Sequence, residues 1–560
     1  EKDNQKIVDN SNWIFLAVTP TVGKKIIKNL KFRSNQTIIS FISTITLVEL
    51  KKTIMNKIII VGGGTSGWIT LAYLVATTKL DIVIIHSDEI DTLGVGESTT
   101  PTIKHVAETC GLDEKTWMKR SKASFKYGIE FLNFNNIGSR WFHSFDDFIP
   151  SQCFSTPITE FGKSNFKKEL SSVEYFLHQR IHDKKYNSDW FNTSQGGSQL
   201  LVDKQLSPYN QDGIVNFNKF PGYSYHINAH EFGSSLRDNV PSDRYTEIKS
   251  TVKNVEYGEE GIKSLTLDNG SKISADLYVD CSGFKRILIN KLASFNHYDG
   301  LINNAAVWGS VKTQSYRPST ISIAQKYGWI WETPTWGQIG SGYVFCDDFI
   351  STSDAEKYMI NYWKLKGYDW KPKRSVKFHS GSLDSVAVKN VVSNGLGQSF
   401  IEPLEATSIM VICVTVKNIS KLINKNKIWG IKESLIFSKV MKKFLNETME
   451  FVLYHYTLSD RNDTEYWRAY KTIDVLESVS TMIEKKLKQE WVNHAETLLN
   501  GYNWASMLVG YDKPYLGQLP KIEEWEIDNY EFYTKQLVEN YRYHYQNNMT
   551  VKDRLEYINF

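Results

Sequence analysis

The sequence predicts an α/β fold in which a Rossmann-like βαβ unit opens a mixed β-sheet and is followed by a mainly helical C-terminal region. Three observations lead to this prediction. A glycine-rich turn separates two apolar runs near residue 60, alternating segments fill the middle of the chain, and residues beyond about 405 carry apolar side chains at three- and four-residue spacing. The 560 residues suffice for a large buried core, in one extended domain or in two or three interlocked ones.

The βαβ unit is predicted from the stretch "KIIIVGGGTSGWITLAYLVATTKLDIVIIHSD", residues 57–88. Its pattern indicates an apolar strand, a glycine turn, a helix and a second apolar strand. Gly62, Gly64 and Gly67 have the GxGxxG spacing. Such glycines permit a tight turn, let the backbone approach a pyrophosphate and bring the helix close to the strand. We therefore expect these three residues to bind a dinucleotide cofactor.

The second apolar strand ends in His86, where dinucleotide-binding folds usually place an acid that accepts the ribose hydroxyls. A neutral imidazole can also accept one hydroxyl hydrogen bond, and Asp88 and Glu89 follow closely. Two interpretations stay open: His86 binds the cofactor, or it is only a surface residue at the end of the strand.

Two further glycine-containing segments are predicted to border the cofactor. The loop "LGVGESTTPT", residues 93–102, is rich in glycine and hydroxyl groups, which makes Gly96, Glu97 and Ser98 candidates for binding it. The stretch "ADLYVDCSGFKR", residues 275–286, predicts an apolar strand that ends at Gly283. Flavoproteins often return to the nucleotide with such a strand.

Composition argues against several function classes. The 66 Lys and Arg residues nearly balance the 62 Asp and Glu residues, so nucleic acid is not an expected partner. The five cysteines are scattered without CxxC or Cys/His spacing, so we expect no metal site and a cytoplasmic location. No uninterrupted apolar run reaches the roughly 20 residues that cross a bilayer, so no membrane partner is expected.

The stretch "GWIWETP", residues 328–334, sets Trp329 and Trp331 two positions apart. In an extended chain, residues i and i+2 point to the same face, so both indoles would form one aromatic wall. From these residues alone the pair is either ordinary core or the wall of a site.

Several separated stretches together resemble the flavin-dependent tryptophan halogenase family. They are "GGGTSGW", "GVGEST", "FKYGIEF", "VDCSGF", "GWIWETP" and "FIEPLEAT", in the family's order, and the resemblance covers nearly all of residues 55–515. The tryptophan motif is the most specific; the family has W-x-W-x-I-P, and Thr333 stands here at the isoleucine. The resemblance implies an FAD-binding, flavin monooxygenase-type fold and an FADH2-dependent halogenase, an oxidoreductase.

In this family FADH2, O2 and a halide ion give hypohalous acid, which migrates through the protein to an aromatic substrate. The resemblance implies that Trp329, Trp331 and Pro334 form a wall near the flavin that keeps the substrate away from it. Its catalytic lysine falls on Lys126, which would donate a hydrogen bond to hypohalous acid or form a haloamine.

The stretch around Lys126 is "ASFKYGIEF". If it is extended, Ser124, Lys126 and Gly128 share one face, with Phe125 and Tyr127 on the other. A dry site would lower the pKa of the lysine and favour the neutral amine.

The resemblance places the catalytic glutamate at Glu405 in "FIEPLEAT", where it would polarise the lysine and take up the ring proton. Glu402, three residues earlier, is the rival acid and is the candidate for a structural role.

The family binds halide just after this glutamate. Because Pro403 favours a helix start, the free backbone N–H groups of Thr407 and Ser408 can hold an anion. The family usually has Ser-Thr-Gly here, whereas this chain has Ala406, Thr407 and Ser408. The exchange of one hydroxyl and one glycine can change the shape or the halide preference of the site.

The substrate segments match the family less well. "WFHSFDDF", residues 141–148, aligns with its aromatic clamp, which implies substrate contacts by His143 and Phe145, and "NGYNWASMLVG" adds Trp504. Tryptophan-specific members place a glutamate four or five residues before that tryptophan, where this chain has Asn500 and Leu499.

The nearest upstream acid is Glu496, eight residues before Trp504. A site without a partner for a buried ammonium should reject a zwitterionic amino acid. We therefore expect free tryptophan to be a poor substrate and an uncharged or larger electron-rich indole or phenol to be preferred.

The chain is expected to divide into three parts. Residues 55–425 would form the FAD-binding module with inserted substrate segments, and residues 426–560 a helical region that covers the substrate. Residues 1–54 contain no methionine, and Met55 directly precedes the first strand. We therefore expect residues 1–54 to be a leader or an artificial extension outside the native fold.

Partners follow from the halogenase interpretation. The sequence has one nucleotide-binding motif and no second site for a nicotinamide, so a separate reductase would supply FADH2. Homo-oligomerisation is implied by the resemblance only.

Two alternatives to the halogenase remain. An FAD-dependent aromatic hydroxylase shares the nucleotide motifs but normally carries a Gly-Asp pair, which "VVSNGLGQSFIEP", residues 391–403, lacks. A catalytically inactive flavin-binding protein is suggested by the departures at His86, Thr333, Ala406 and Ser408.

Overall fold

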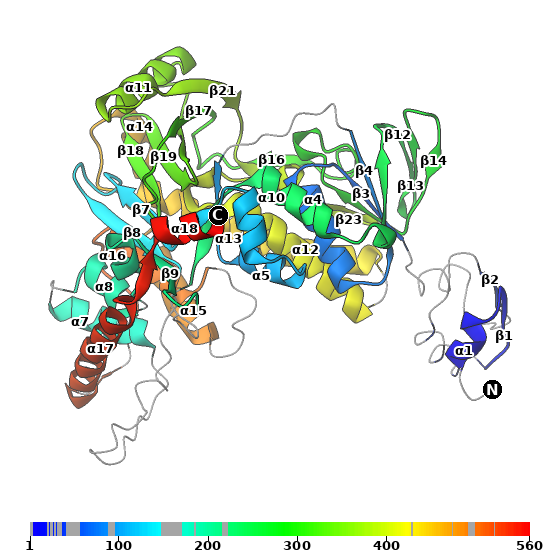
Figure 1. Cartoon of the computed structure of the whole chain (residues 1–560), viewed down its shortest axis with the longest axis horizontal. Coiled ribbons are helices and arrows are strands. Elements are labelled where there is room, and N and C mark those ends of the chain that lie inside the picture. Colours follow the sequence, from blue (N-terminus) through cyan, green and yellow to red (C-terminus); the bar gives the residue numbers. More distant parts are fainter. Residues whose placement is uncertain are drawn as a thin grey trace.

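The computed structural model of the chain has two large β-sheets on opposite sides of its main body, with helices packed between and below them (Figure 1). The structure describes residues 4–19, 22, 26, 30, 36–40, 57–87, 96–146, 171–183, 186–195, 197–215, 222–426, 429–472, 474–490, 499–519, 521–522 and 524–559.

A six-stranded sheet carries the predicted βαβ unit. It is parallel except at one edge, and its central strands are buried on both faces, which explains their continuous apolar runs. Helix α4 (Thr65–Thr77) joins two of these strands and packs against α10 (Ala229–Asn239) and α12 (Thr407–Asn426). In spatial order the strands are β11 (Tyr245–Lys249), β4 (Asp81–His86), β3 (Lys57–Val61), β15 (Leu277–Asp280), β24 (Val391–Ser393) and β23 (Ala387–Val388).

A seven-stranded sheet carries the paired tryptophans. Neighbouring strands are antiparallel except for one parallel pair, β18 with β7, and helix α11 (Thr352–Leu365) covers one face over a second apolar core. In spatial order the strands are β21 (Lys371–Lys377), β17 (Ala305–Lys312), β20 (Gln338–Phe345), β19 (Gly328–Thr335), β18 (Thr320–Gln325), β7 (Gly128–Leu132) and β8 (Arg140–Ser144).

A small antiparallel sheet brings the predicted cofactor loop to the lysine strand. Its order is β5 (Gly96–Ser98), β10 (Ser224–Asn228) and β6 (Ser124–Lys126). As expected, Ser124 and Lys126 share one face of an extended strand, but Gly128 belongs to the separate strand β7, because the chain changes sheets at Tyr127. The Tyr127 N–H donates to Pro318 O instead of continuing the ladder.

The remaining described elements include short helices and small sheets around these three. The helices before residue 240 are α5 (Thr102–Thr109), α6 (Glu114–Arg120), α7 (Ser172–His182), α8 (Ser188–Gln195) and α9 (Ser198–Asp203). The small sheets comprise β12 (Val252–Gly258), β13 (Gly261–Leu267), β14 (Lys272–Ile273), β16 (Phe295–His297), β22 (Gly381–Leu383) and β25 (Ser399–Phe400). Single 3₁₀ turns are η2 (Ser242–Arg244), η3 (Gly283–Lys285), η4 (Gly395–Gly397), η5 (Pro403–Glu405) and η6 (Tyr470–Thr472).

The C-terminal part is mainly helical, as the spacing of apolar residues predicts. One short strand departs from this pattern. Strand β26 (Asn548–Thr550) pairs with β9 (Leu206–Asn210), which places the end of the chain beside a segment from its middle. The helices after α12 are α13 (Ile431–Thr457), α14 (Glu465–Ala469), α15 (Leu476–Glu490), α16 (Gly501–Gly510), α17 (Glu524–Tyr545) and α18 (Val551–Asn559).

The first residues form a small unit of their own. Helix α1 (Asn4–Asp9) and the parallel strands β1 (Trp13–Leu16) and β2 (Thr37–Ser40) share a small apolar cluster, and Figure 1 places them to one side of the main body.

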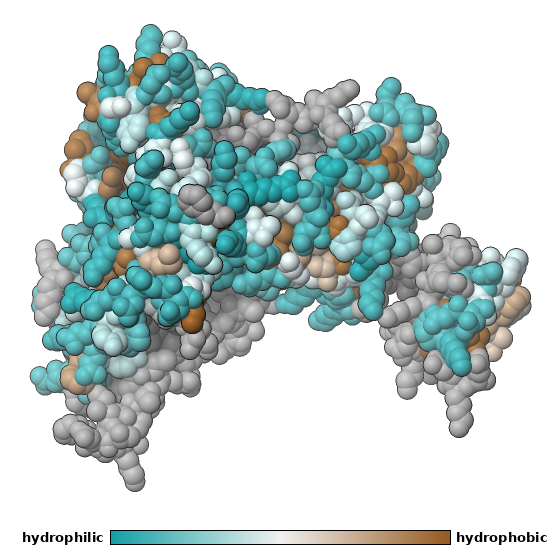
Figure 2. Space-filling model, viewed as in Figure 1, coloured by the Kyte–Doolittle hydropathy of each residue, from teal (hydrophilic) through white to brown (hydrophobic). Residues whose placement is uncertain are grey.

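The surface face in Figure 2 is mainly hydrophilic, with apolar side chains gathered in small patches. Among the described residues, no helix is long and apolar enough to span a membrane. Cys110, Cys281, Cys346 and Cys413 are free thiols, and Cys153 lies outside the described residues.

Candidate functional site

Lys126 is fully buried at the end of β6. Its Nζ donates to the Thr99 carbonyl at 2.9 Å and lies 4.6 Å from the centre of the Phe145 ring. Burial lowers the pKa of Lys126 to about 7, and the Glu405 carboxylate partly offsets this effect. Lys126 therefore exchanges its proton near neutral pH, inside the protein.

Glu405 lies at the end of η5 between two buried histidines. His143 Nδ1 is 2.9 Å from Oε2, and His455 Nε2 is 2.7 Å from Oε1. Burial opposes ionisation, but His143 and His455 outweigh it and hold the pKa of Glu405 at about 2. The Glu405 charge also raises the pKa of Lys126, so the two residues interact although they are far apart in sequence.

The orientation of His143 follows from its neighbours. The Asn503 amide nitrogen lies 3.2 Å from His143 Nε2, which fits a lone pair on that nitrogen and a proton on Nδ1. The Nδ1–H can then donate to Glu405.

Of the predicted substrate residues, Phe145 lies under the lysine and His143 beside the glutamate. Trp504 on α16 is fully buried, 4.9 Å from Phe451, which in turn is 5.5 Å from His143 between ring centres. Trp504 is therefore one ring removed from His143.

Trp329 and Trp331 are neighbours on β19, with ring centres 6.1 Å apart. Trp329 is 1% exposed and belongs to the main apolar core, while Trp331 is half-buried. The inner indole is therefore part of the core, and the outer one packs against the core while keeping partial exposure. Pro334, the last residue of the motif, is buried on the same strand.

Glu402 is fully buried and contacts the inner indole of this pair. The Asn303 amide donates to its Oε2 at 2.7 Å and the Trp329 indole N–H at 3.5 Å. Burial raises the pKa of Glu402 to about 7, although these donors and Tyr456 favour the carboxylate. These contacts give the rival acid a structural part in holding Trp329.

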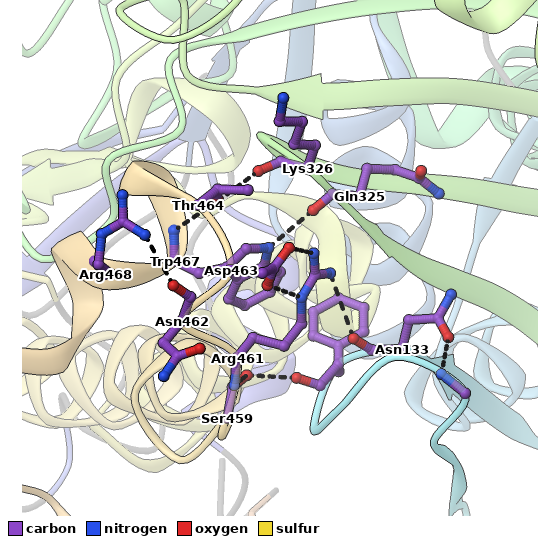
Figure 3. A network of polar contacts seen from close by, with 12 residues as sticks. Asn133, Gln325, Lys326, Ser459, Arg461, Asn462, Asp463, Thr464, Trp467 and Arg468 are labelled. Carbon is purple, nitrogen blue, oxygen red and sulfur yellow. Dashed lines mark hydrogen bonds and ion pairs between the residues drawn. The ribbon is translucent and has the colours of Figure 1, made fainter.

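A second polar network fixes the turn from which the tryptophan strand starts (Figure 3). Arg461 binds Asp463 through two hydrogen bonds of 2.9 Å, and its guanidinium lies 4.4 Å from the Trp467 ring. The Trp467 indole donates to the Gln325 carbonyl at 2.9 Å. The loop after α13 therefore anchors the β18–β19 turn.

The predicted halide residues lie at the N-terminus of α12. Ala406 adopts a left-handed conformation with φ of 56°, so Pro403 begins the separate turn η5 and not this helix. Thr407 and Ser408 border a small cavity of about 20 Å³. Within the described part of the chain, the buried Thr407 hydroxyl has no hydrogen-bond partner. The cavity is lined by Gly395, Leu396, Ser399, Ile401, Thr407, Ser408, Val411 and Ile412.

The glycine turn has the tight geometry that its spacing predicts. Gly62 has φ of +125°, and a Cβ there would lie 2.2 Å from the Cys281 carbonyl oxygen. A Cβ on Gly67 would lie 1.9 Å from the Gly62 oxygen, and Gly64 caps α4 without a side chain. This cradle leaves backbone N–H groups at a helix N-terminus and fits a flavin pyrophosphate.

His86 is 7% exposed, so the interpretation as a surface residue is wrong. Its Nε2 lies 2.8 Å from Glu247 Oε1, and the Arg237 guanidinium donates to the same oxygen at 2.9 Å. An acid is thus present near the strand end, but it comes from β11. Asp88 and Glu89 lie outside the described residues.

The other predicted cofactor residues border the same region. Gly96 packs against the end of the tryptophan hairpin, and burial raises the pKa of Glu97 to about 7. The Ser98 hydroxyl contacts Thr320 Oγ1 at 2.6 Å. Gly283 has φ of +65° and lies beside the η4 turn that borders the cavity.

Sequence patterns did not indicate His455, Glu247 or His226, a fully buried histidine on β10. Each acquires its role through a partner from another element, so no spacing along the chain identifies it. Among the described residues, no group of three or more His, Cys, Asp or Glu side chains could hold a metal ion.

Comparisons with known proteins agree with this architecture. The tryptophan halogenase family model matches residues 57–518. Tryptophan 7-halogenase RebH from Lentzea aerocolonigenes is 28% identical over 443 residues, covering 77% of this chain and 81% of that protein.

Two solved structures share the fold. The tryptophan halogenase from Shewanella frigidimarina has a TM-score of 0.76 at 23% identity, over 91% of this chain and 98% of that chain. Tar14, a tryptophan C-6 flavin-dependent halogenase, has a TM-score of 0.75 at 24% identity, over 90% of this chain and 100% of that chain. The predicted fold class is confirmed, and the chain belongs to the tryptophan halogenase family, a family of flavin-dependent halogenases.

Proposed function

We propose that this flavin-dependent halogenase uses Lys126 to hold hypohalous acid beside an electron-rich aromatic ring and Glu405 to accept the ring proton. The observation that carries the proposal is the coupling of a fully buried lysine to a buried carboxylate in one aromatic-lined site.

The chemistry has two balanced parts. The reduced flavin supplies two electrons, so that FADH2, O2, halide and a proton yield FAD, hypohalous acid and water. Hypohalous acid and an aromatic C–H then give a C–halogen bond and water. The second part is where the residues of this chain act on the reacting atoms.

Lys126 acts in its ammonium form. The Thr99 carbonyl, the Phe145 ring and the Glu405 carboxylate all favour the positive charge, and together they hold Nζ in place. An ammonium can donate a hydrogen bond to the oxygen of hypohalous acid, so that the hydroxide leaves the halogen as water when the ring attacks.

Glu405 is ionised before it accepts the ring proton. With a pKa of about 2 it is a weak base, but the halogenated ring cation is a much stronger acid and can release its proton to it. His455, whose Nε2 lies 2.7 Å from Glu405 Oε1, can then take up that proton, while His143 keeps donating its Nδ1–H to the other oxygen.

The cofactor assignment rests on the shape of the glycine cradle between β3 and α4, where Gly62 and Gly67 have no room for a Cβ. FAD would bind there as FADH2, delivered by a separate flavin reductase. The α12 N-terminus, with the Thr407 hydroxyl, offers donors for the halide ion.

The substrate is proposed to be an uncharged indole or phenol rather than free tryptophan. Asn500 is the N-cap of α16 and exchanges hydrogen bonds with Asn503, and Leu499 is 9% exposed. Neither side chain offers a carboxylate for a substrate ammonium. Glu496 lies outside the described residues.

The deciding experiment combines the protein with FAD, a flavin reductase and NADH, and offers chloride, bromide or iodide with a panel of indoles and phenols. Catalase and a protein-free control remove halogenation by stray peroxide. Enzyme-dependent halogenated product is expected by mass. A hydroxylated product would support the aromatic hydroxylase, and bound FAD without any product would support the inactive flavin-binding protein.

The substrate proposal has its own test. Asn500→Asp keeps a good helix cap and adds a carboxylate, while Asn500→Ser keeps the cap without charge. We expect kcat/KM for tryptophan, relative to an uncharged indole, to rise only in the aspartate variant. Equal kcat/KM values for both substrates in the wild-type protein would refute the proposal.

A further inference from the structure

A buried chain of hydrogen bonds links the predicted cofactor loop to the tryptophan motif through His226. The Ser98 hydroxyl lies 2.6 Å from Thr320 Oγ1, which lies 2.9 Å from His226 Nε2. His226 Nδ1 is 3.2 Å from Ser124 Oγ, which donates to the carbonyl of Pro334. His226 and Ser124 are both fully buried.

The last acceptor in this chain of hydrogen bonds, the Pro334 carbonyl, sets the direction of every bond in it. A carbonyl can only accept, so the Ser124 proton points to Pro334 and Ser124 Oγ is left as an acceptor for His226. Nδ1 must then carry the imidazole proton, and Nε2 must accept from Thr320. Thr320 Oγ1 in turn accepts from Ser98.

The same histidine lies next to the lysine strand. In the small sheet His226 pairs with Ser124, and Ser224 pairs with Lys126, so these four side chains share one face of the sheet. Burial and the charge of Lys126 both lower the pKa of His226 well below its usual range. The imidazole is therefore neutral, and Lys126 carries the positive charge of this face.

We propose that His226, as a neutral imidazole with its proton on Nδ1, is a positioning residue that holds the Lys126 strand against Pro334 and the Ser98 loop. The proposal rests on the proposed role of Lys126. The chain of hydrogen bonds ends at the Pro334 carbonyl, which cannot pass a proton on. These hydrogen bonds therefore fix the position of the Lys126 strand and do not transfer protons.

The tautomer can be observed without any catalysis. Imidazole ¹⁵N NMR on the whole protein labelled at its 12 histidines, with His226→Asn to identify the signal, reports the protonation of each ring nitrogen. We expect a neutral Nδ1–H ring that does not titrate between pH ~6 and ~8, where an ordinary histidine does. A proton on Nε2, or an imidazolium, would overturn the proposal even if the protein proved to be an active halogenase.

Two substitutions test the positioning role. In His226→Asn the amide nitrogen can take the place of Nδ1 and still donate to Ser124 Oγ, whereas His226→Leu removes this donor. We expect His226→Leu to lose about tenfold or more in halogenated product per FADH2 oxidised, because small displacements of a reacting group are costly. His226→Asn should recover most of that loss.

The pH profile separates positioning from an electrostatic effect. If His226 is neutral, His226→Leu should lower kcat but leave the apparent pKa of the halogenation rate unchanged. A cationic His226 would instead depress the pKa of Lys126, so a rise of the apparent pKa in His226→Leu would contradict the proposal.

Strand β18 offers a matched control. Thr320→Val removes the donor to His226, whereas Ser322→Ala removes a buried hydroxyl that has no hydrogen-bond partner within the described residues. Product yield should fall severalfold in the first variant and stay unchanged in the second. An equal fall of product yield in both variants would show that β18 tolerates no change and that the hydrogen bonds of His226 have no special role.

Discussion

The glycine turn before α4 and the buried side-chain cluster around Lys126 differ in what they are made of. The turn consists of backbone from one short segment, with Gly62 and Gly67 leaving no room for a Cβ. The cluster consists of side chains from separate elements: Lys126 from β6, Glu405 from η5 and His455 from α13.

The difference teaches where each site is sensitive to change. A backbone cradle depends on shape and should respond to added volume by losing cofactor affinity. A side-chain cluster depends on charges placed in a dry environment. Substitutions there should lower the halogenation rate while the affinity for the cofactor is retained. Substitutions in the two regions should therefore produce separable losses.

The largest effect is expected from Lys126→Met, which keeps the length of the buried chain without its charge. We expect halogenated product to fall by about 10³-fold, within the range for a residue that donates a proton or hydrogen bond in the transition state. The FAD dissociation constant, measured by flavin fluorescence, should remain within about twofold of wild type, since Lys126 is not part of the cradle.

The control is Lys119→Met, at an exposed position on α6. It should match the wild type in both measurements. Wild-type product yield in Lys126→Met would remove the lysine from the mechanism.

Glu405→Gln should slow halogenation by about 10²-fold, because the ring proton loses its acceptor. It should also change the pH dependence. The carboxylate raises the pKa of Lys126, so its removal should move the apparent pKa of the residual activity below about 7. A shift to higher pH would contradict the coupling between the two groups.

Gly67→Ala tests the cradle. A Cβ there would meet the Gly62 oxygen at 1.9 Å, so the turn must open, and we expect the FAD dissociation constant to rise about tenfold. Product formation should recover at saturating FAD. Gly233→Ala on α10, where a Cβ meets its nearest neighbour at 3.5 Å, is the control and should bind FAD normally. Loss of product that excess FAD does not restore would break the separation of the two regions.

The smallest expected effect is the pH dependence of the wild-type protein. The folded-state pKa of Lys126 is lowered to about 7, so its ammonium form is lost as pH rises through that value. Single-turnover halogenation should therefore fall about threefold between pH ~6.5 and ~7.5, as one titrating group predicts. A rate that rises over this interval would favour the haloamine route through the neutral amine.

Local patterns were sufficient for the cofactor region. Strand β3, the glycines and α4 are continuous in the sequence, and the apolar runs and GxGxxG spacing predict both the elements and the close contacts between them. The pairing of the two indoles of β19 is equally local, because it follows from the two-residue repeat of a strand.

Only the tertiary structure decided the surroundings of Lys126, Glu405 and His86. The break between β6 and β7 at Tyr127 depends on a hydrogen bond to Pro318, and the two histidines at Glu405 come from β8 and α13. The acid beside His86 comes from a neighbouring strand, not from the strand end where the motif predicts it.

The sequence by itself determined the family, and its short motifs indicated the glycine turn, Lys126 and Glu405 as candidate site residues. The tertiary structure decided the protonation states. A pKa depends on burial and on charges brought together from distant segments, and neither quantity is a property of local sequence.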